Sequence, residues 1–490
     1  MFYFLAIWIG LSASTPDAWP AFLGAGAGPR DASNLPLTWS PNENLAWIKP
    51  VPGHGQSSPV VWDNRAFITS VEGPEKNTYH VVCLNTTDGS ELWHKQIENS
   101  APEKNSYYIS RAAPTPLVDE HRVIAFFESG DCVAYDHAGK ELWTRTLAKD
   151  EGPFIAEFGL GASPCQTESA LFVLLEHDGP SSLLAIDKQS GKRLWKASRE
   201  PRRSWSSPAI IEVEGEPQVV VSSAGTVDGY DPETGKLLWS FEDVGGNTST
   251  TPIDIGGGRF LIGASPGRNG ENAGSAADSN GLMQVTRDGD TWTATPKWTA
   301  AKATPTWASP IVHEGLAYWI NRSGVVYCFD VTTGEEVYTE RIKQASWATP
   351  FGVGNRVYFF GKDGLVTVLA AGREFKILAE NTTWSDDTLP PEAKLAEETS
   401  EERQRAAAMF SKPTLYGVAV TDDAFLLRVG NAVICVRYTH PKLPILPKRC
   451  PTPFLEIDAV GKELDIAIVL QQLPFGTAST LDFDLQQTQH

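Results

Sequence analysis

The chain has 490 residues, of which 41% are hydrophobic and 21% charged, a composition that excludes a disordered, collagen-like or coiled-coil protein. Its 60 acidic residues against 41 basic ones give a formal net charge of -19, which argues against binding to the phosphate backbone of a nucleic acid. The 16 Trp residues against only 3 Met need many well-defined packing sites, so an internal repeat is favoured over the roughly three domains that the length suggests.

The chain begins with an apolar run of about a dozen residues, from Phe2 to Ala13. Such a run is shorter than the roughly 20 residues of a membrane-spanning helix but typical of the core of a signal peptide. We therefore expect residues 1–18 to be a signal peptide and the protein to be exported to the periplasm or the extracellular space, with no transmembrane span. Because basic residues are missing from its start, an uncleaved segment that tethers the protein is the alternative.

The rest of the chain repeats a phrase in which a β-rich stretch leads to a turn Gly and, four residues later, to an aromatic residue. LLAIDKQSGKRLW, which ends at Trp195, is one copy. Gly between two alternating apolar runs indicates a hairpin, because Gly accepts the positive φ of a tight or bulged turn. The aromatic positions are Trp93, Trp143, Trp195, Trp239 and Tyr338, with a weaker copy at Trp298.

A second phrase, of the type SSPVV, precedes each copy. Its Pro should begin a strand or lie on an edge, because Pro cannot donate to a central ladder. A further apolar segment lies between the two phrases, so each unit is predicted to form four short strands, the pattern of a propeller blade. The prolines are Pro59, Pro116, Pro164, Pro208, Pro252, Pro310 and Pro350, and a degenerate eighth phrase lies at Gly417.

The two ends of the repeat are complementary. The eighth unit, from Tyr416 to Arg437, supplies three strands without a Trp strand, whereas residues 44–51, with Trp47, form a Trp strand with nothing before it. Pairing them closes a ring and removes the open sheet edges. We therefore predict an all-β fold for residues 19–437: a single eight-bladed β-propeller of four-stranded antiparallel blades, closed by pairing the N-terminal strand with the last blade.

Three segments fall outside the blades. Residues 267–281 are predicted to be an inserted surface loop, in which Asp278 and Asn280 are weak candidates for cation ligands. Residues 389–412 are charged and rich in Ala, and are predicted to be an inserted helix that starts at Pro390 and Pro391. Residues 438–490 form a C-terminal tail to which we assign no role.

The spacing of Ala185, Gly191 and Trp195 resembles the tryptophan-docking motif of the quinoprotein, or PQQ-like, propeller family. The resemblance extends over almost the whole of residues 19–437. It implies that an aromatic residue of one blade stacks on the next blade and has a structural rather than a ligand-binding role. The blade-docking residues are then Trp47, Trp93, Trp143, Trp195, Trp239, Trp298 and Tyr338.

The same resemblance raises the alternative of a PQQ-dependent dehydrogenase, whose members carry an adjacent pair of cysteines on the quinone and a calcium ion. Here no two cysteines are adjacent, and the patterns HExxH, GxSxG and GxxxxGK[ST] are absent. We therefore expect no catalytic residue, no metal site and no cofactor, and PQQ with calcium remains the alternative. The six isolated cysteines are Cys83, Cys132, Cys165, Cys328, Cys435 and Cys450.

Each strand that carries the repeated aromatic residue is connected to the strand that follows the Pro of the next unit. In a propeller, these connections should gather at one mouth of the central channel. They carry aromatic and Arg residues, which are typical of protein and peptide contacts, although the Trp residues could equally pack the loop entrances. His54 lies between two glycines that would let its backbone and imidazole approach a ligand. The candidate binding residues are His54, Gln56, Tyr107, Tyr108, Arg111, Arg202, Arg203, Trp205, Trp307 and Trp347.

These observations together predict a non-catalytic, exported scaffold, which we expect to be a monomer. Its resemblance to the propellers of outer-membrane protein assembly factors implies an envelope or secreted protein or peptide as its partner. Since a fold does not fix a function, an enzyme is the alternative: a PQQ-dependent oxidoreductase, or a hydrolase with its site at the channel mouth.

Overall fold

The computed structural model describes residues 17–26, 31–107, 109–267, 270–385, 387–393, 395 and 398–439. The expected signal peptide, apart from residues 17 and 18, lies outside the described residues, as do Tyr108, Cys450 and the tail beyond residue 439. Among the residues described, no helix has both the length and the apolar character needed to cross a membrane.

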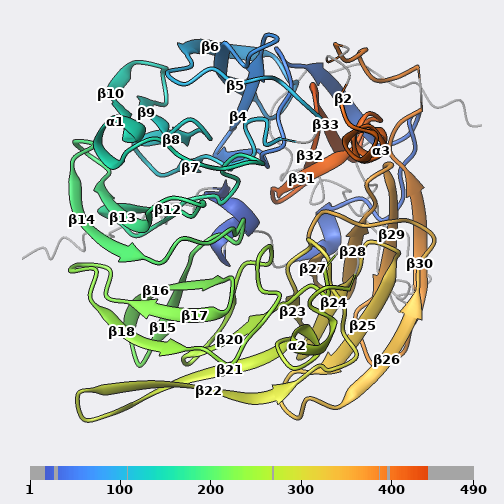
Figure 1. The fold of residues 1–490 in the computed structure, drawn as a ribbon. Coiled ribbons are helices and arrows are strands. Elements are labelled where there is room, and N and C mark those ends of the chain that lie inside the picture. The colour runs from blue at the N-terminus through green and yellow to red at the C-terminus, as the bar shows by residue number, and fades with distance from the viewer. Residues whose placement is uncertain are drawn as a thin grey trace, which may run out of the picture. The chain divides into compact units, whose positions relative to one another are not determined.

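Eight antiparallel sheets follow one another in chain order around a ring (Figure 1). Each sheet is a blade, and of the four strands given for each blade below, the first lies nearest the centre and the fourth lies outermost. The first four blades are β3 (Val60–Trp62), β4 (Arg65–Glu72), β5 (Thr78–Asn85) and β6 (Glu91–Glu98); β7 (Leu117–Val118), β8 (Arg122–Phe126), β9 (Asp131–Asp136) and β10 (Glu141–Thr146); β11 (Cys165–Gln166), β12 (Ala170–Leu175), β13 (Ser181–Asp187) and β14 (Arg193–Arg199); and β15 (Ala209–Val213), β16 (Glu216–Ser223), β17 (Thr226–Tyr230) and β18 (Leu237–Phe241).

The last four blades repeat this order, except that the eighth takes its outer strand from the start of the chain. They are β19 (Ile253–Gly256), β20 (Arg259–Ile262), β21 (Gly281–Asp288) and β22 (Thr291–Thr299); β23 (Ile311–His313), β24 (Leu316–Ile320), β25 (Val325–Asp330) and β26 (Glu336–Arg341); β27 (Phe351–Val353), β28 (Arg356–Phe360), β29 (Leu365–Ala370) and β30 (Ile377–Thr382); and β31 (Leu415–Val420), β32 (Ala424–Val429), β33 (Ala432–Arg437) and β2 (Leu45–Pro50).

Strand β2 closes the ring. It pairs antiparallel with β33, with Ile48 opposite Ile434 and Lys49 opposite Val433. In blades one to seven the inner strand begins at the residue directly after the Pro of the repeated phrase, as expected for a residue that cannot donate to a ladder. The predicted eight-bladed, four-stranded propeller is therefore confirmed.

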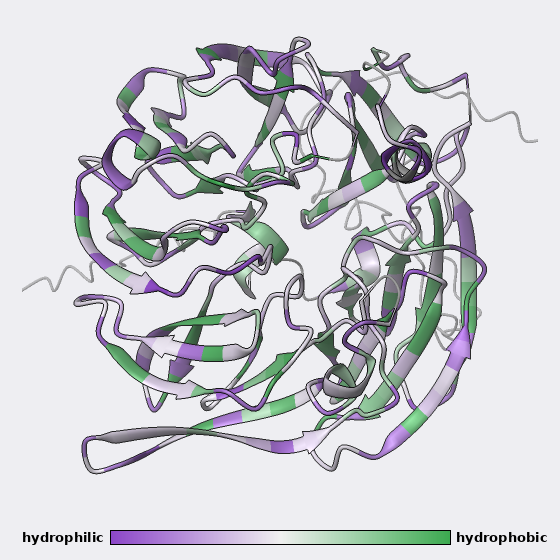
Figure 2. Ribbon diagram, viewed as in Figure 1, coloured by the Kyte–Doolittle hydropathy of each residue, from purple (hydrophilic) through white to green (hydrophobic). Residues whose placement is uncertain are grey.

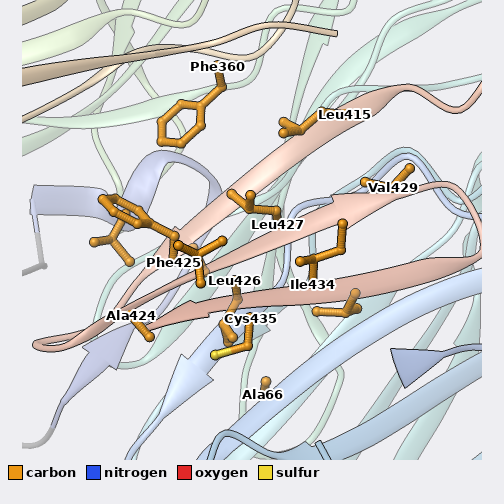
Figure 3. Packing of buried hydrophobic residues seen from close by; sticks show 14 of the residues in the cluster. Ala66, Phe360, Leu415, Ala424, Phe425, Leu426, Leu427, Val429, Ile434 and Cys435 are labelled. Atoms are coloured by element: carbon orange, nitrogen blue, oxygen red, sulfur yellow. The ribbon is translucent and has the colours of Figure 1, made fainter. Parts of the chain in front are cut away.

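The core lies in the middle strands and between neighbouring blades. In blade three every residue of β12 is buried, whereas β14 is mostly exposed or half-buried. Figure 2 shows the same trend, with hydrophilic colour concentrated on outer strands and connections. In Figure 3, Phe360 of blade seven and Ala66 of blade one lie on either side of blade-eight residues such as Leu427 and Cys435, all in one apolar cluster. Apolar packing thus joins each blade to the next.

The repeated Trp residues dock on the turn Gly of the following blade. The Nε1–H of Trp143 donates to the backbone oxygen of Lys188 at 2.9 Å. A Cβ on Gly191 would lie 2.7 Å from the indole ring of Trp143. This turn therefore has no room for a larger residue. Trp47, Trp93, Trp195 and Trp298 make the same pair of contacts with the blades that follow them.

Two aromatic positions of the repeat depart from this geometry. Trp239 donates instead to Gln218 Oε1 of its own blade at 2.7 Å and lies across Gly229, where a Cβ would be 2.2 Å from the indole. This contact explains why Gly replaces the Ala of the docking motif in the fourth blade. Tyr338 packs edge-on against Phe375 of blade seven, with ring centroids 5.6 Å apart.

Two parts of the N-terminal segment extend the propeller. β1 (Ala18–Trp19) adds to β3, the 3-10 helix η1 (Phe22–Gly26) follows, and the oxygen of Pro20 accepts from Val118 N at 2.9 Å, where an inner strand ends. After the second 3-10 helix, η2 (Ala32–Asn34), Trp39 stacks on Tyr358 of blade seven and contacts Phe425 of blade eight. Trp39 thus fills the interface for which β30 supplies no Trp.

The helices are short. α1 (Leu147–Glu151) follows β10, and α2 (Ala273–Ala277) lies in the 267–281 insertion, which was expected to be a loop throughout. The Asn280 side chain there donates to the backbone oxygens of Ala264 and Ala276, so it anchors the insertion to the protein's own backbone.

The helix expected over residues 389–412 is limited to α3 (Glu401–Phe410). Its N-cap is Ser400, whose hydroxyl accepts from the backbone N–H of Arg403. The expected start at Pro390 and Pro391 is wrong, because the oxygens of both prolines instead accept from the side chain of Asn431, at 3.3 and 3.0 Å. The residues before α3 are therefore held against blade eight.

Candidate functional site

The face at which the inner strands begin is called the mouth face below. It carries the connections between successive blades and those between the second and third strands of each blade, and both insertions lie in these connections. All the described candidate binding residues are on this face, but the structure divides them into three groups that do not contact one another through any described contact. They are His54, Gln56, Tyr107 and Arg111; Arg202, Arg203 and Trp205; and Trp307 and Trp347.

The first group lies where blades eight, one and two meet. The backbone N–H of Gln56 donates to the oxygen of Arg111 at 3.1 Å, and the backbone N–H of Arg111 donates to Gln56 Oε1 at 2.9 Å. The guanidinium of Arg111 lies over the Tyr107 ring, 5.3 Å from its centroid. His54 Nδ1 is 3.3 Å from Glu392 Oε2.

The structure adds to this group three residues that the sequence analysis did not select: Glu392, Tyr416 and Arg428. Arg428 lies in the fully buried strand β32 and donates to the backbone oxygens of Gly55 and Thr69, each at 3.2 Å. Tyr416 packs edge-on against the ring of His54. The sequence signal that could have identified Arg428 is a single charge within an otherwise apolar strand, because Arg is almost never fully buried unless it is paired.

The two arginines of this group are unusual in their burial. Arg111 is 1% exposed and Arg428 is fully buried, yet neither guanidinium lies within 4.0 Å of a carboxylate among the described residues. Burial lowers the pKa of both, that of Arg428 to about 9, while the nearby Glu392 acts in the opposite direction. Buried charges are normally paired, so this arrangement is expensive for the fold. We call Arg111, Arg428, Glu392, His54 and Tyr416 the arginine cluster.

Glu392 supplies the only negative charge of the arginine cluster. Burial alone would raise its pKa, but the hydrogen bond with His54 and the neighbouring positive charges hold the pKa below its usual value. Glu392 is therefore ionised at neutral pH. Its charge balances only one of the two arginines.

The second group is an ion-pair network on blades two to four. The side chain of Arg203 is half exposed, and its Nε and Nη2 each donate to a carboxylate oxygen of Asp178 at 2.7 Å. Its Nη1 also lies 3.0 Å from Oε2 of Glu157. Trp205 donates its Nε1–H to the oxygen of Gly159 at 3.2 Å. Arg202 Nη1 donates to Thr226 Oγ1 at 2.9 Å. These three residues mainly join the mouth connections to one another.

The third group is aromatic. Trp307 and Trp347 come from two successive connections, are both half-buried, and meet edge to face with ring centroids 4.9 Å apart. The Nζ of Lys362 lies over the Trp347 ring, 4.4 Å from its centroid. This arrangement combines large apolar area with a positive charge at the surface of the mouth face.

The described residues between 387 and 413, called the cap segment, reach from blade eight towards blades one to three. Glu398 accepts from the hydroxyl of Ser106 and lies 3.7 Å from Lys104, and Arg403 is 3.3 Å from Glu157. Beneath the cap segment is a pocket of about 480 Å³. Its lining residues are Tyr107, Leu389, Pro390, Pro391, Glu392, Leu395, Ser411 and Pro413.

The family description "Outer membrane protein assembly factor BamB" matches residues 39–154, 155–268 and 279–425. The chain belongs to the BamB family. The crystal structure of BamB from Moraxella catarrhalis has a TM-score of 0.54 at 13% identity, over 81% of this chain and 98% of that chain. Quinohemoprotein alcohol dehydrogenase from Comamonas testosteroni has a TM-score of 0.51 at 11% identity, over 86% of this chain and 80% of that chain. At these identities the two structures support the fold alone.

Among curated proteins, polyvinylalcohol dehydrogenase from a Pseudomonas species is 26% identical over 278 residues, which is 47% of this chain and 41% of that protein. The chain spans about two fifths of the length of the curated relatives that it matches. BamB-family membership is thus established, whereas neither a scaffold role nor an oxidoreductase activity follows from these similarities.

The described residues of this BamB-family chain do not fit the quinone site that the resemblance implied. The site that the resemblance implied carries two adjacent cysteines, but the described cysteines lie in five different blades and none forms a disulfide. Within the described ranges, no three His, Cys, Asp or Glu side chains gather in an arrangement that could hold a metal ion. No catalytic step is therefore assigned to PQQ or calcium. Burial raises the pKa of four thiols to about 12, those of Cys83, Cys132, Cys328 and Cys435.

The buried His54 makes stability depend on pH. Burial, and secondly Arg111, lower its pKa from 6.5 to about 4, so the unfolded state binds more protons between these values and stability falls as the pH falls through this window. Between about pH 7 and about pH 4, we expect the unfolding free energy of the wild-type protein to fall by about 3 kcal/mol more than that of His54→Gln. Urea denaturation at both pH values measures this difference.

The matched control is His121→Gln, which replaces an exposed imidazole. It should leave the pH dependence of the wild-type protein unchanged. Equal pH dependence in the wild-type protein and His54→Gln would contradict the assignment of a neutral, buried His54.

Proposed function

We propose that this BamB-family propeller is an exported, non-catalytic, monomeric scaffold that binds an envelope or secreted protein or peptide at its mouth face. The observation that carries the proposal is the half-buried pair of Trp307 and Trp347 with Lys362 beside it. Trp is among the residue types that are enriched in the hot spots of protein–protein interfaces. The family description, an outer membrane protein assembly factor, supports a partner of this class.

The position of the pair supports the same conclusion. Trp307 lies in the connection from blade five to blade six and Trp347 in the connection from blade six to blade seven. Strands on both sides anchor each connection, so a partner that covers the pair meets a preorganised surface and loses little ordering entropy on binding. Arg203 and Trp205 contact neighbouring connections of the same chain, so we assign them a role in holding this face together.

We expect Trp307→Ala and Trp347→Ala each to weaken binding of the envelope partner by roughly thirtyfold, because loss of such an anchor costs about 2 kcal/mol. Immobilised full-length variants and envelope extract, with each bound protein quantified, measure the effect. The control is Trp62→Ala: Trp62 is also half-buried but ends the inner strand of blade one, at the opposite face. If the proteins that bind the wild-type chain are lost with Trp62→Ala but retained with Trp307→Ala and Trp347→Ala, the proposal is contradicted.

A quinone-dependent oxidoreductase is the second candidate, and the match to polyvinylalcohol dehydrogenase favours it. Titration of the purified protein with PQQ and calcium separates it from the scaffold. The scaffold proposal expects no saturable change in quinone absorbance and no dye-linked alcohol oxidation. If both signals are observed, the scaffold proposal is wrong and the protein is a quinone-dependent oxidoreductase.

A further inference from the structure

The arginine cluster lacks a counter-ion. Three guanidinium nitrogens, Nε and Nη2 of Arg111 and Nη1 of Arg428, are buried and have no hydrogen-bond partner among the described residues. Both arginines flank the same short segment, since Arg428 donates to the Gly55 oxygen and Arg111 exchanges two hydrogen bonds with Gln56. Two positive charges therefore face one carboxylate, that of Glu392, which pairs directly with His54 instead.

The unused nitrogens of Arg111 indicate the chemistry of the missing group. Nε and Nη2 form one edge of the guanidinium, and two parallel N–H donors on one edge match the two oxygens of a carboxylate. The same protein shows this match at Arg203, whose Nε and Nη2 hold the two carboxylate oxygens of Asp178 at 2.7 Å each. In Arg111 the equivalent edge is buried and no described carboxylate pairs with it; the neutral Tyr416 hydroxyl interacts with this guanidinium but supplies no negative charge.

The pocket under the cap segment lies next to Arg111, with Tyr107 between the two. Tyr107 lines the 480 Å³ pocket under the cap segment, and its ring lies against the guanidinium of Arg111. Glu392 also lines the pocket. A ligand in the pocket is thus separated from Arg111 by the half-buried Tyr107, and the negative charge of Glu392 opposes an entering anion.

We propose that the arginine cluster is a binding site for a carboxylate, which Arg111 holds by its Nε and Nη2 edge while Arg428 supplies a second positive charge. The carboxylate enters from the pocket under the cap segment when the Tyr107 ring moves aside. It belongs either to a small organic acid or to the C-terminus of a peptide. The site does not depend on the scaffold proposal, because none of its residues contacts the Trp307 and Trp347 pair through a described contact.

The test is calorimetric titration of the full-length protein with two probes at constant ionic strength. One arm uses acetate, with acetamide as its neutral counterpart; the other uses triglycine with a free C-terminus, with triglycine amide as its counterpart. Saturable binding of an acid, at least tenfold tighter than its amide, supports the site, and the arm that binds identifies the source of the carboxylate. Absence of such a difference in both arms overturns the proposal.

Two variants assign the binding to the cluster. Glu392→Gln removes the opposing charge and should tighten the acid roughly tenfold, whereas Glu401→Gln, which removes an exposed charge from the same cap segment, should change nothing. Arg111→Lys keeps the charge but removes the two-donor edge, and should weaken the acid at least tenfold. Equal tightening in both Gln variants, or unchanged binding in a folded Arg111→Lys, would overturn the assignment; if Arg111→Lys does not fold, the two Gln variants decide.

Discussion

Gly55→Ala should lower the free energy of unfolding by about 3 kcal/mol, because the added methyl group has nowhere to go. A Cβ on Gly55 would lie 2.3 Å from the oxygen of Thr69 and 2.5 Å from Nη2 of Arg428. Thr69 lies inside strand β4, where it pairs with Val81 of β5, so its oxygen cannot move without breaking blade one. Arg428 is fully buried, and its Nη2 donates to the same Thr69 oxygen, so moving this side chain would break that hydrogen bond. Urea denaturation of the purified proteins measures the difference.

Gly274→Ala is the control for that substitution. Gly274 is exposed within α2, and a Cβ there meets no atom within 4 Å. Since Ala forms helices better than Gly, we expect this variant to be as stable as the wild-type protein or more stable by up to about 1 kcal/mol. If both variants unfold alike, the close approach of Gly55 to the arginine cluster is not a constraint on the fold.

Trp143→Ala should cost about 4 kcal/mol, because it removes a buried indole from the contact between blades two and three. Trp143→Phe should cost only about 1 kcal/mol, since it keeps an aromatic ring against Gly191 but loses the hydrogen bond to the Lys188 oxygen. The free energy of unfolding from urea denaturation gives both values. Equal costs for the two variants would mean that stacking on the turn Gly contributes nothing to the junction between blades.

The fold was predictable from the sequence because each blade carries local signals. Gly191 marks a turn and Pro164 marks the start of a strand through backbone properties that need no knowledge of distant residues. Ring closure by β2 followed from matching a Trp strand without a blade to a blade without a Trp strand. Trp39 could not be placed in this way, because its partners Tyr358 and Phe425 are more than 300 residues away.

The candidate site was predicted in part. Propeller geometry placed His54, Gln56 and Arg111 on one face, and the structure shows that the Gln56 segment contacts Arg111. Glu392 and Arg428 were missed because they reach the cluster only when blade eight closes onto blade one and the cap segment lies against blade eight. The start of α3 was also misplaced, because long-range contacts of the prolines with Asn431 outweigh the local helical preference.

Photo-cross-linking in intact cells tests whether a partner protein binds at the mouth face. A photo-reactive amino acid in place of Trp347 lies at the aromatic pair, and the same amino acid in place of Trp62 lies at the opposite face. We expect a discrete cross-linked product of this chain and one partner protein from position 347 and none from position 62. A product from position 62 alone, or no product from either position, would contradict the proposal.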